Sequence, residues 1–428
     1  MHESFQRLKN LLENGFTPYH VSDAIQSQLL ENGFTPLYEE EDWKIEENGK
    51  YYVQRDGSVL AFCVGNLDTF SFKIIATHTD SCGLKLKENF LVHTDLYTKL
   101  NVEPYGGGLW YSFFDRPLKI AGRVVYEENG KLQVQTVQSP FTLQIPSQAI
   151  HFNRDANEKF SVNPQIDLLP LLSENKTVSE EEFWQSMQVS KRVLGHDLFL
   201  VNAEKSYFAG IHDEYIASPR IDNLTSVQAT VDALIAQADS NGVCVGAFFN
   251  HEEVGSNTAQ GAGGDFLENT LRRIAFSLFF NEVEFFKAMA NSFLLSVDNA
   301  HAVHPNHPEK SDITNKTEMG KGIVIKSHAK QAYATGAVTS AILKNIFEKA
   351  GVPYQTFFNR SDMRSGATLG NIAMARFGIH GADIGLAQLA MHSACECVSK
   401  TDYLGLVSGL HAFFSSRIQQ EKTNILVQ

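Results

Sequence analysis

The chain has 428 residues, of which 43% are hydrophobic and 20% are charged, so it can bury a sizeable core and is not disordered. Its formal net charge of −13 argues against binding to nucleic acid or to an anionic membrane, since both need a basic face. The sequence contains no apolar run of the ~18 residues that a membrane span needs, and the charged N-terminus does not resemble a signal peptide. Five cysteines, few and odd in number, favour a reduced, cytoplasmic protein.

Roughly the first 60 residues predict helices followed by a hairpin. The segment LLENGFTP occurs twice, and each copy places a glycine after a leucine-rich helical pattern and a proline three residues later. We expect Gly15 and Gly33 to end two helices in the left-handed conformation. Asp56-Gly57 then predicts a hairpin turn between alternating apolar residues.

Residues 93–215 have a different pattern, which predicts a β-rich domain. Asn129-Gly130 marks another hairpin turn, and FTLQI and AIHF extend the strand-like character. Ser179, with Glu182 three residues later, predicts the start of one helix.

The flanking segments, 1–92 and 216–428, predict strands that alternate with helices. Buried strands are expected at FKIIA, GVCVGAFF, FLLSV and PYQTFF, and helices after Asp222, before Gly351 and, as a final pair, after His392. This alternation predicts an α/β fold whose mainly parallel central sheet is flanked by helices. The catalytic domain would be discontinuous, with 93–215 inserted as a β-rich dimerisation domain.

Metal-competent side chains follow several of the predicted strands. In an open α/β sheet the ligand crevice lies at the carboxyl ends of the strands, so residues from distant segments can form one site there. The candidates are His78, Asp80, Asp222, Glu252, Glu253, Asp298 and His392.

These residue types suit a hydrolase with two metal ions. Two divalent ions need a bridging carboxylate and mixed histidine and carboxylate ligands, and the ions activate a water molecule at neutral pH. A carboxylate that is not a ligand must take the proton of that water. Glu252 and Glu253 project to opposite sides of an extended segment, so one can bind metal while the other faces the water. Asp80 could orient the ring of His78.

Each residue also has a purely structural interpretation. The Glu252-Glu253 pair can be a solvated stretch, Asp298 a turn or helix cap, and His392 a structural histidine. Because HExxH, GxSxG and P-loop motifs are absent from the sequence, the combination of residues carries the hypothesis.

Two further clusters do not predict a metal site. His301, His304 and His307 fall in a segment that Pro305 and Pro308 interrupt, which predicts a loop. Cys395 and Cys397 follow His392, but no second cysteine pair has a spacing that suits zinc.

Nine segments match one known family in its own order. They are ATHTDSCGLKLK, EPYGGGLWYSFFDRPLKIAGRV, AIHFNR, SPRIDNL, FNHEEVGS, SVDNAHAVHPN, KGIVIKSHAKQAYAT, RSDMRSGATLGNI and LAQLAMHSACE. With these segments the chain resembles the aspartyl aminopeptidases, dinuclear metallo-aminopeptidases that form tetrahedral dodecamers. The resemblance covers essentially the whole chain and implies a zinc-exopeptidase-like fold.

The resemblance implies a ligand set for two divalent metal ions per subunit. His78 and Asp298 would bind one ion, Glu253 and His392 the other, and Asp222 would bridge both. Zinc is the expected metal, although histidine and carboxylate ligands also suit cobalt or manganese.

The resemblance also implies four roles outside the ligand set. Glu252 would be the general base and Asp80 the partner of His78. His151 would reach into the active site of a neighbouring subunit, and Lys326 would face the acidic side chain of the substrate. For His151 and Lys326, packing and an edge-strand charge are the alternative interpretations.

Two segments depart from the family pattern. Cys82-Gly83 stands where the family often has proline, and Met363, Arg364 and Ser365 intervene in the RSD…GATLG segment. Arg364 adds a second cation near the expected pocket. These departures leave the proposed metal ligands unchanged and the side-chain preference open.

The sequence therefore predicts a metallo-aminopeptidase that removes N-terminal residues, preferably Asp or Glu, from small peptides with a free N-terminus. The resemblance implies a homo-oligomer, a dodecamer built from dimers. The alternatives are a related exopeptidase with broader or apolar specificity, a dipeptidase, or a deacylase of N-acyl amino acids. A non-catalytic assembly protein would lack the base or the bridge, whereas Glu252 and Asp222 are both present.

Overall fold

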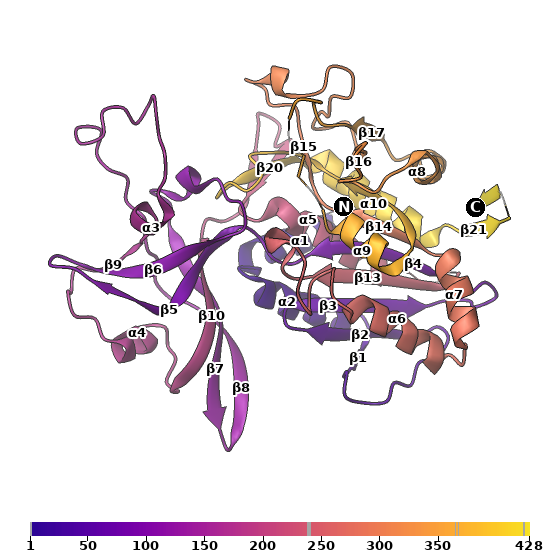
Figure 1. The fold of residues 1–428 in the computed structure, drawn as a ribbon, viewed down its shortest axis with the longest axis horizontal. Helices are drawn as coiled ribbons and strands as arrows, with labels where there is room; N and C mark the ends of the chain where they lie inside the picture. Colours follow the sequence, from indigo (N-terminus) through magenta and orange to yellow (C-terminus); the bar gives the residue numbers. More distant parts are fainter. Residues whose placement is uncertain (1, 238–240, 364, 367, 423) are drawn as a thin grey trace.

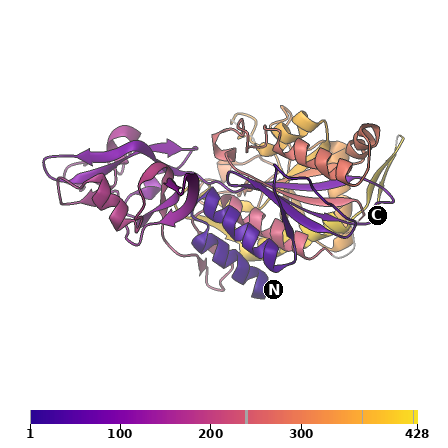
Figure 2. The ribbon, with the colours of Figure 1, turned by 90° about the horizontal axis from the view of Figure 1, so that it is seen from below.

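The computed structural model describes residues 2–237, 241–363, 365–366, 368–422 and 424–428. These residues form an α/β body and, beside it, an elongated β-rich body (Figures 1 and 2).

The α/β body is built on a mixed sheet. In the described residues its strand order is β1 (Thr35–Leu37), β2 (Lys50–Arg55), β3 (Ser58–Val64), β13 (Val243–Phe249), β4 (Phe72–His78), β14 (Phe293–Val297), β18 (His380–Gly385), β16 (Ile323–Lys326) and β17 (Tyr354–Phe357). The central strands β13, β4, β14 and β18 run parallel to one another, whereas β3 and β16 are antiparallel to their neighbours β13 and β18. The predicted α/β fold with a mainly parallel sheet is confirmed.

Helices cover both faces of this sheet (Figure 2). One face carries α1 (His2–Asn14), α2 (Pro18–Glu31), α5 (Ile221–Ile235), α8 (Ala337–Ala350) and α10 (Lys400–Ser415), and the other carries α6 (Phe266–Ser277), α7 (Glu282–Ala290) and α9 (Leu369–Phe377). Successive residues of a strand point to opposite faces, so Leu294 packs in one core and Leu295 in the other. Because both faces of the sheet are buried, the sequences of the central strands are continuous apolar runs.

The β-rich body is a separate sheet with its own core. Its strand order is β8 (Lys131–Gln138), β7 (Leu118–Glu128), β10 (Val193–Asn202), β5 (Gly83–His93), β6 (Thr98–Tyr105) and β9 (Leu171–Ser173). Two short helices, α3 (Pro164–Asp167) and α4 (Glu180–Ser186), accompany it, and the side chain of Ser179 caps α4 as expected. The division expected after residue 92 falls at the end of β5, a strand that already pairs in this sheet.

A smaller sheet lies where the two bodies meet. Its strand order is β11 (Tyr207–Ala209), β12 (Tyr215–Ser218), β20 (Glu396–Ser399), β19 (Ala387–Leu389) and β15 (Ala300–His301). The chain ends in the hairpin β21 (Ile418–Glu421) and β22 (Asn424–Val427). Among the described residues, no helix combines the length and the apolar character needed to cross a membrane.

Local turn chemistry accounts for several elements, with one exception. The hairpins at Asp56-Gly57 and Asn129-Gly130 are present, and all four residues have positive φ. Gly33 has φ +79°, as expected of a left-handed cap, but Gly15 is not in that region. A Cβ at Gly15 would lie 2.7 Å from the carbonyl oxygen of Leu11, so close approach, and not a positive φ, requires glycine there.

Two expectations for the secondary structure are wrong. The AIHF segment is not a strand, because residues 150–152 form an exposed turn without a pairing strand. In the described residues after His392 a single helix, α10, follows strand β20, where two helices were expected; the hairpin β21–β22 comes after α10. Pairing partners from distant segments decide both outcomes, and local patterns do not reveal them.

Candidate metal centre

Three neighbouring parallel strands deliver most of the candidate side chains to one edge of the central sheet. His78 is the last residue of β4, and Asp298 directly follows β14. Glu252 and Glu253 lie in a short 3-10 helix just beyond β13, and not in the extended segment that was expected from the sequence. Since carboxyl ends of parallel strands meet at the same edge, these residues gather there.

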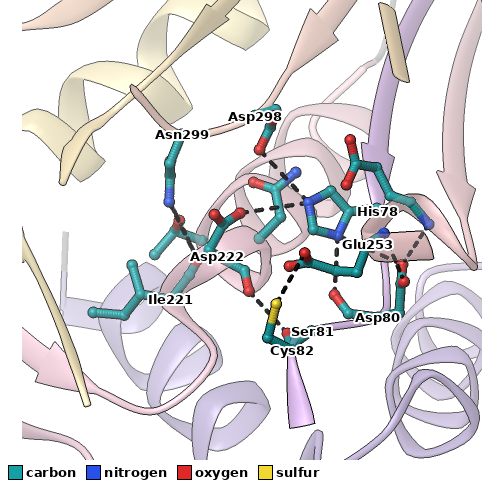
Figure 3. A network of polar contacts seen from close by, with 12 residues as sticks. His78, Asp80, Ser81, Cys82, Ile221, Asp222, Glu253, Asp298 and Asn299 are labelled. Carbon is teal, nitrogen blue, oxygen red and sulfur yellow. Dashed lines mark hydrogen bonds and ion pairs between the residues drawn. The ribbon is translucent and has the colours of Figure 1, made fainter. Parts of the chain in front are cut away.

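One group of potential metal ligands is centred on His78 (Figure 3). Its Nε2 atom lies 3.4 Å from Oδ1 of Asp222 and 3.5 Å from Oδ1 of Asp298. Two ligands bound about 2.0–2.1 Å from a tetrahedral zinc ion are about 3.3 Å apart. All three side chains are buried, so the group has the spacing and the donor types of a metal site.

A second group is centred on His392, which lies in the loop between β19 and β20. Its Nε2 atom lies 3.5 Å from Oε2 of Glu253 and 3.7 Å from Oδ2 of Asp222. The two oxygens of Asp222 therefore face two different histidines. A carboxylate in this position can bridge two cations.

Buried carboxylate oxygens without a hydrogen-bond partner test whether a cation fits between these side chains. Oδ1 of Asp222 and Oε1 of Glu253 are buried and have no hydrogen-bond partner among the described residues. Burial and repulsion from Asp222 raise the pKa of Glu253 to about 8, and burial raises the pKa of Glu252 well above its ordinary value. A divalent cation would pair with these oxygens, so the donor set fits a metal ion.

The histidine and aspartate of the first group also have shifted pKa values. Burial acts to lower the pKa of His78, but contacts with Asp222 and Asp298 raise it well above the ordinary value. Burial acts to raise the pKa of Asp298, but Lys326 and His78 hold it below the ordinary range. The group thus combines opposite charges in a buried setting.

Asp80 holds several elements of the site together. Its Oδ1 accepts a hydrogen bond from the backbone N–H of Glu252, at 3.1 Å, and its Oδ2 accepts one from that of Glu253, also at 3.1 Å. The hydroxyl of Tyr105 donates to Oδ2 at 2.8 Å. Nδ1 of His78 lies 2.9 Å from the backbone oxygen of Asp80 and 3.6 Å from its Oδ1. Asp80 therefore contacts both the His78 ring and the two-glutamate segment.

Sequence reasoning missed two residues of this arrangement. Glu396, at the start of β20, is buried, and its carboxylate accepts from the backbone N–H of Asp222 at 2.9 Å and from that of His392 at 2.7 Å. Its only sequence signal is an acidic residue between two cysteines, four positions after a candidate histidine. Tyr105 precedes three glycines, and nothing local pairs it with Asp80.

A cleft of about 460 Å³ opens on both groups of ligands. Glu252 lines it together with His78, Asp298 and Lys326. Lys326 ends strand β16 and is 1% exposed. Its Nζ atom donates to the backbone oxygen of Asp298 at 2.7 Å and lies 3.6 Å from Oδ2 of the same residue. The cleft has the size of a site for a small ligand.

Four residues that the sequence singled out do not line the cleft or are not described. His151 is exposed in a turn of the β-rich body and does not line the cleft. His301 lines the cleft, whereas His304 and His307 are not among its lining residues. Arg364 lies outside the described residues.

A mainly parallel sheet with histidines and buried carboxylates near the carboxyl ends of its strands, facing a cleft, is the arrangement of a metal-dependent hydrolase. Comparison with known proteins shows to which family of metal-dependent hydrolases the chain belongs. The family model for the Aminopeptidase I zinc metalloproteases (M18) matches residues 11–414. The chain belongs to this family, as its resemblance to the aspartyl aminopeptidases predicted, and it is a metal-dependent aminopeptidase.

Relatives and solved structures match over nearly the full chain. A probable M18 family aminopeptidase 2 of Clostridium acetobutylicum is 38% identical, over 96% of this chain and 99% of the relative. A probable M18 family aminopeptidase 2 of Pseudomonas fluorescens is 36% identical, over 96% of this chain and 98% of the relative. The structure of the Ape4 and Nbr1 complex matches with a TM-score of 0.90 and 34% identity, over 96% of this chain and 85% of the other. The mApe1 dodecamer of S. cerevisiae matches with a TM-score of 0.80 and 26% identity, over 96% of each chain.

Proposed function

We propose that this aminopeptidase uses two divalent metal ions and prefers peptides with N-terminal Asp or Glu. The observation that carries the dinuclear part is Asp222, whose two carboxylate oxygens face His78 and His392. His78, Asp298 and Asp222 would hold one ion; Glu253, His392 and Asp222 would hold the other. Zinc fits these donors, as cobalt and manganese also do.

Bound ions would polarise the scissile carbonyl and lower the pKa of a water molecule. Glu252 lines the cleft beside His78 and Asp298, and among the residues that the structure describes its carboxylate makes no ion pair with His78 or His392. Its carboxylate is therefore free to accept a proton from water at Oε and to deliver it to the leaving amine. The acidic side chains of the site would attract the free α-amino group of a peptide, which restricts cleavage to the N-terminus.

Asp80 and Tyr105 act on Glu252 through its backbone. Asp80 holds the N–H groups of Glu252 and Glu253, and the Tyr105 hydroxyl orients Asp80. These contacts hold the backbone of the 3-10 helix that carries both glutamates. Asp80 also fixes the ring of His78 by accepting from Nδ1.

The acidic preference rests on Lys326. It is a buried cation in the cleft, and a carboxylate side chain of a substrate would gain from its charge in this partly desolvated setting. A broader specificity is the second candidate, because Nζ of Lys326 already donates to the backbone of Asp298 and Asn299. In that case Lys326 serves mainly to position Asp298.

Initial rates on the anilides of Asp, Glu, Leu and Lys separate these possibilities. The protein is stripped of metal and refilled with zinc, cobalt or manganese before each assay. Faster cleavage of the Asp and Glu anilides supports the acidic preference, and faster cleavage of the Leu anilide rejects it while keeping the aminopeptidase. Release of acetate from N-acetylated Asp anilide, without release of aniline from the free-amine substrates, would favour a deacylase instead.

We further propose a homo-oligomer, a dodecamer built from dimers, in which residues 93–215 form the dimerisation domain and His151 enters a neighbouring active site. Ile150 and Phe152, beside His151, are 47% and 87% exposed, and their apolar side chains would be covered if this turn contacts a neighbouring subunit. The S. cerevisiae mApe1 structure, which is described as a dodecamer, supports the assembly size.

We also propose a cytoplasmic location, because the cysteine content is low; cell fractionation tests this location.

Mixed oligomers test the role of His151. Subunits that carry His151→Ala are unfolded and reassembled together with subunits that carry Glu252→Gln. If His151 acts across the interface, mixed particles contain complete sites and regain activity that neither variant has alone. Mixed particles without activity, or an active monomer in native mass measurements, would contradict the proposal.

A further inference from the structure

The thiol of Cys82 lies beside the second group of metal ligands. Cys82 stands between β4 and β5, where the chain passes from one body to the other. Its Sγ atom donates to Oε2 of Glu253 at 3.1 Å, and Figure 3 shows the sulfur directed at this carboxylate. Cys82, Glu253 and His392 offer one ligand atom each within 4.8 Å of one another.

Packing from the β-rich body holds the sulfur in this position. Gly106 follows β6 with φ +76°, and a Cβ there would lie 2.8 Å from Sγ of Cys82 and 3.1 Å from Cβ of Glu253. Glycine therefore allows the backbone to close over both side chains. The thiol is confined between this backbone and the Glu253 carboxylate.

Glu253 supplies independent evidence that a cation belongs beside the thiol. Its side chain is 3% exposed, and its Oε1 atom has no hydrogen-bond partner among the described residues. Within the described part of the chain, Oε2 contacts the ring of His392 and the weak thiol donor of Cys82 and no other side chain. Burying a carboxylate costs free energy, and these few contacts offset little of that cost, so a positive charge is needed nearby.

Resting on the proposed dinuclear function, we propose that Cys82 is a ligand of the metal ion held by Glu253, His392 and Asp222. When the sulfur–metal bond forms, the S–H bond breaks and the proton passes to solvent. The two sites then differ: one has three protein donors, and the other has four, one of them a thiolate.

This difference has a consequence for metal preference. A thiolate is a soft ligand that favours zinc or cobalt, whereas a set of carboxylates and one histidine also suits manganese. Cysteine at this position therefore makes one of the two sites selective. The three-donor site keeps the open position that catalytic zinc sites have.

Cobalt spectroscopy of the stripped protein tests the ligand directly. We expect wild-type protein to bind two equivalents of Co²⁺ and to show a thiolate-to-cobalt charge-transfer band in the near ultraviolet. Cys82→Ser should lose this band and bind one equivalent at least about tenfold more weakly. Cys395→Ser is the matched control, because Cys395 contacts Tyr207 and is not in the ligand group; its band should remain.

The outcomes separate the two proposals. Two equivalents of cobalt without the band, or a band that survives in Cys82→Ser, would overturn the role of Cys82 and leave the dinuclear site standing. Failure to bind a second equivalent in the wild type would overturn both.

A second measurement needs no variant, in case Cys82→Ser does not fold. Wild-type protein is treated with iodoacetamide with and without zinc, and alkylation of each cysteine is followed by mass spectrometry. Protection of Cys82 by zinc is expected, whereas equal alkylation of Cys82 with and without the metal would overturn the assignment.

Discussion

Replacing Glu396 by glutamine tests how the backbone of the metal centre is held. One carboxylate oxygen of Glu396 accepts from the N–H of Asp222 and the other from the N–H of His392, so a single side chain anchors two candidate ligands. Glutamine has the same size but only one oxygen. One of the two N–H groups would lose its acceptor and face an amide NH₂ group instead.

The expected cost follows from leaving one buried donor unpaired, which is about 1–3 kcal/mol. A metal-free chain can relax by moving the backbone of Asp222 or His392, but a bound ion requires both in place. The cost therefore falls on metal binding and corresponds to a loss of about 5- to 150-fold in affinity. This range includes the 10- to 100-fold losses typical of residues that support metal ligands.

Competition with a chromophoric zinc chelator gives the zinc affinity of both proteins. The matched control is Asp402→Asn, because Asp402 is also a buried carboxylate that accepts from two backbone N–H groups, those of Gly320 and Gly322. This control should lower the free energy of unfolding but leave the zinc affinity unchanged. An unchanged zinc affinity in Glu396→Gln, or an equal loss in Asp402→Asn, would refute the reasoning.

Three further predictions concern catalysis, selectivity and pH. Glu252→Gln should lower kcat by about 10²- to 10⁴-fold with unchanged metal content by elemental analysis, and near-normal turnover would exclude Glu252 as the base. Lys326→Met should lower kcat/KM at least about tenfold more for Asp anilide than for Leu anilide, since it removes a charge pair; equal losses would make Lys326 a positioning residue of Asp298. In metal-free protein, burial raises the pKa of Glu253 to about 8, so the folded state binds its proton more tightly and loses stability as pH rises from about 4.5 to 8. The increase in Tm on adding zinc should therefore be larger at pH 8 than at pH 6, and an equal or smaller increase at pH 8 would contradict this assignment.

Much of the fold follows from local patterns in the sequence. Continuous apolar runs predicted the strands of the central sheet, and Asp56-Gly57 and Asn129-Gly130 predicted two hairpins, because these signals depend on a few neighbouring residues. The AIHF segment shows where prediction from local sequence fails. Its apolar residues suit a strand, but they form an exposed turn, since a strand also needs a partner that local sequence does not supply.

The candidate ligands were visible because each follows a buried strand or begins a helix, and the rule for open α/β sheets brings such positions together. The contacts that support these ligands could not be predicted from the sequence. Glu396 lies 174 residues from the Asp222 backbone it holds, and Cys82 lies 171 residues from Glu253. Neither residue belongs to a periodic pattern, so sequence position carried no signal of the pairing.

The sequence by itself therefore determined the fold class, the family and the residue types of the metal centre, because hydrophobic periodicity and residue chemistry are local properties. Tertiary structure alone decided that both oxygens of Asp222 face histidines, that Glu396 anchors two ligands, and that Gly106 confines Cys82 against Glu253. These features depend on distances of a few ångströms between segments that are distant in the sequence, and only the packing of the sheets and helices brings these segments together.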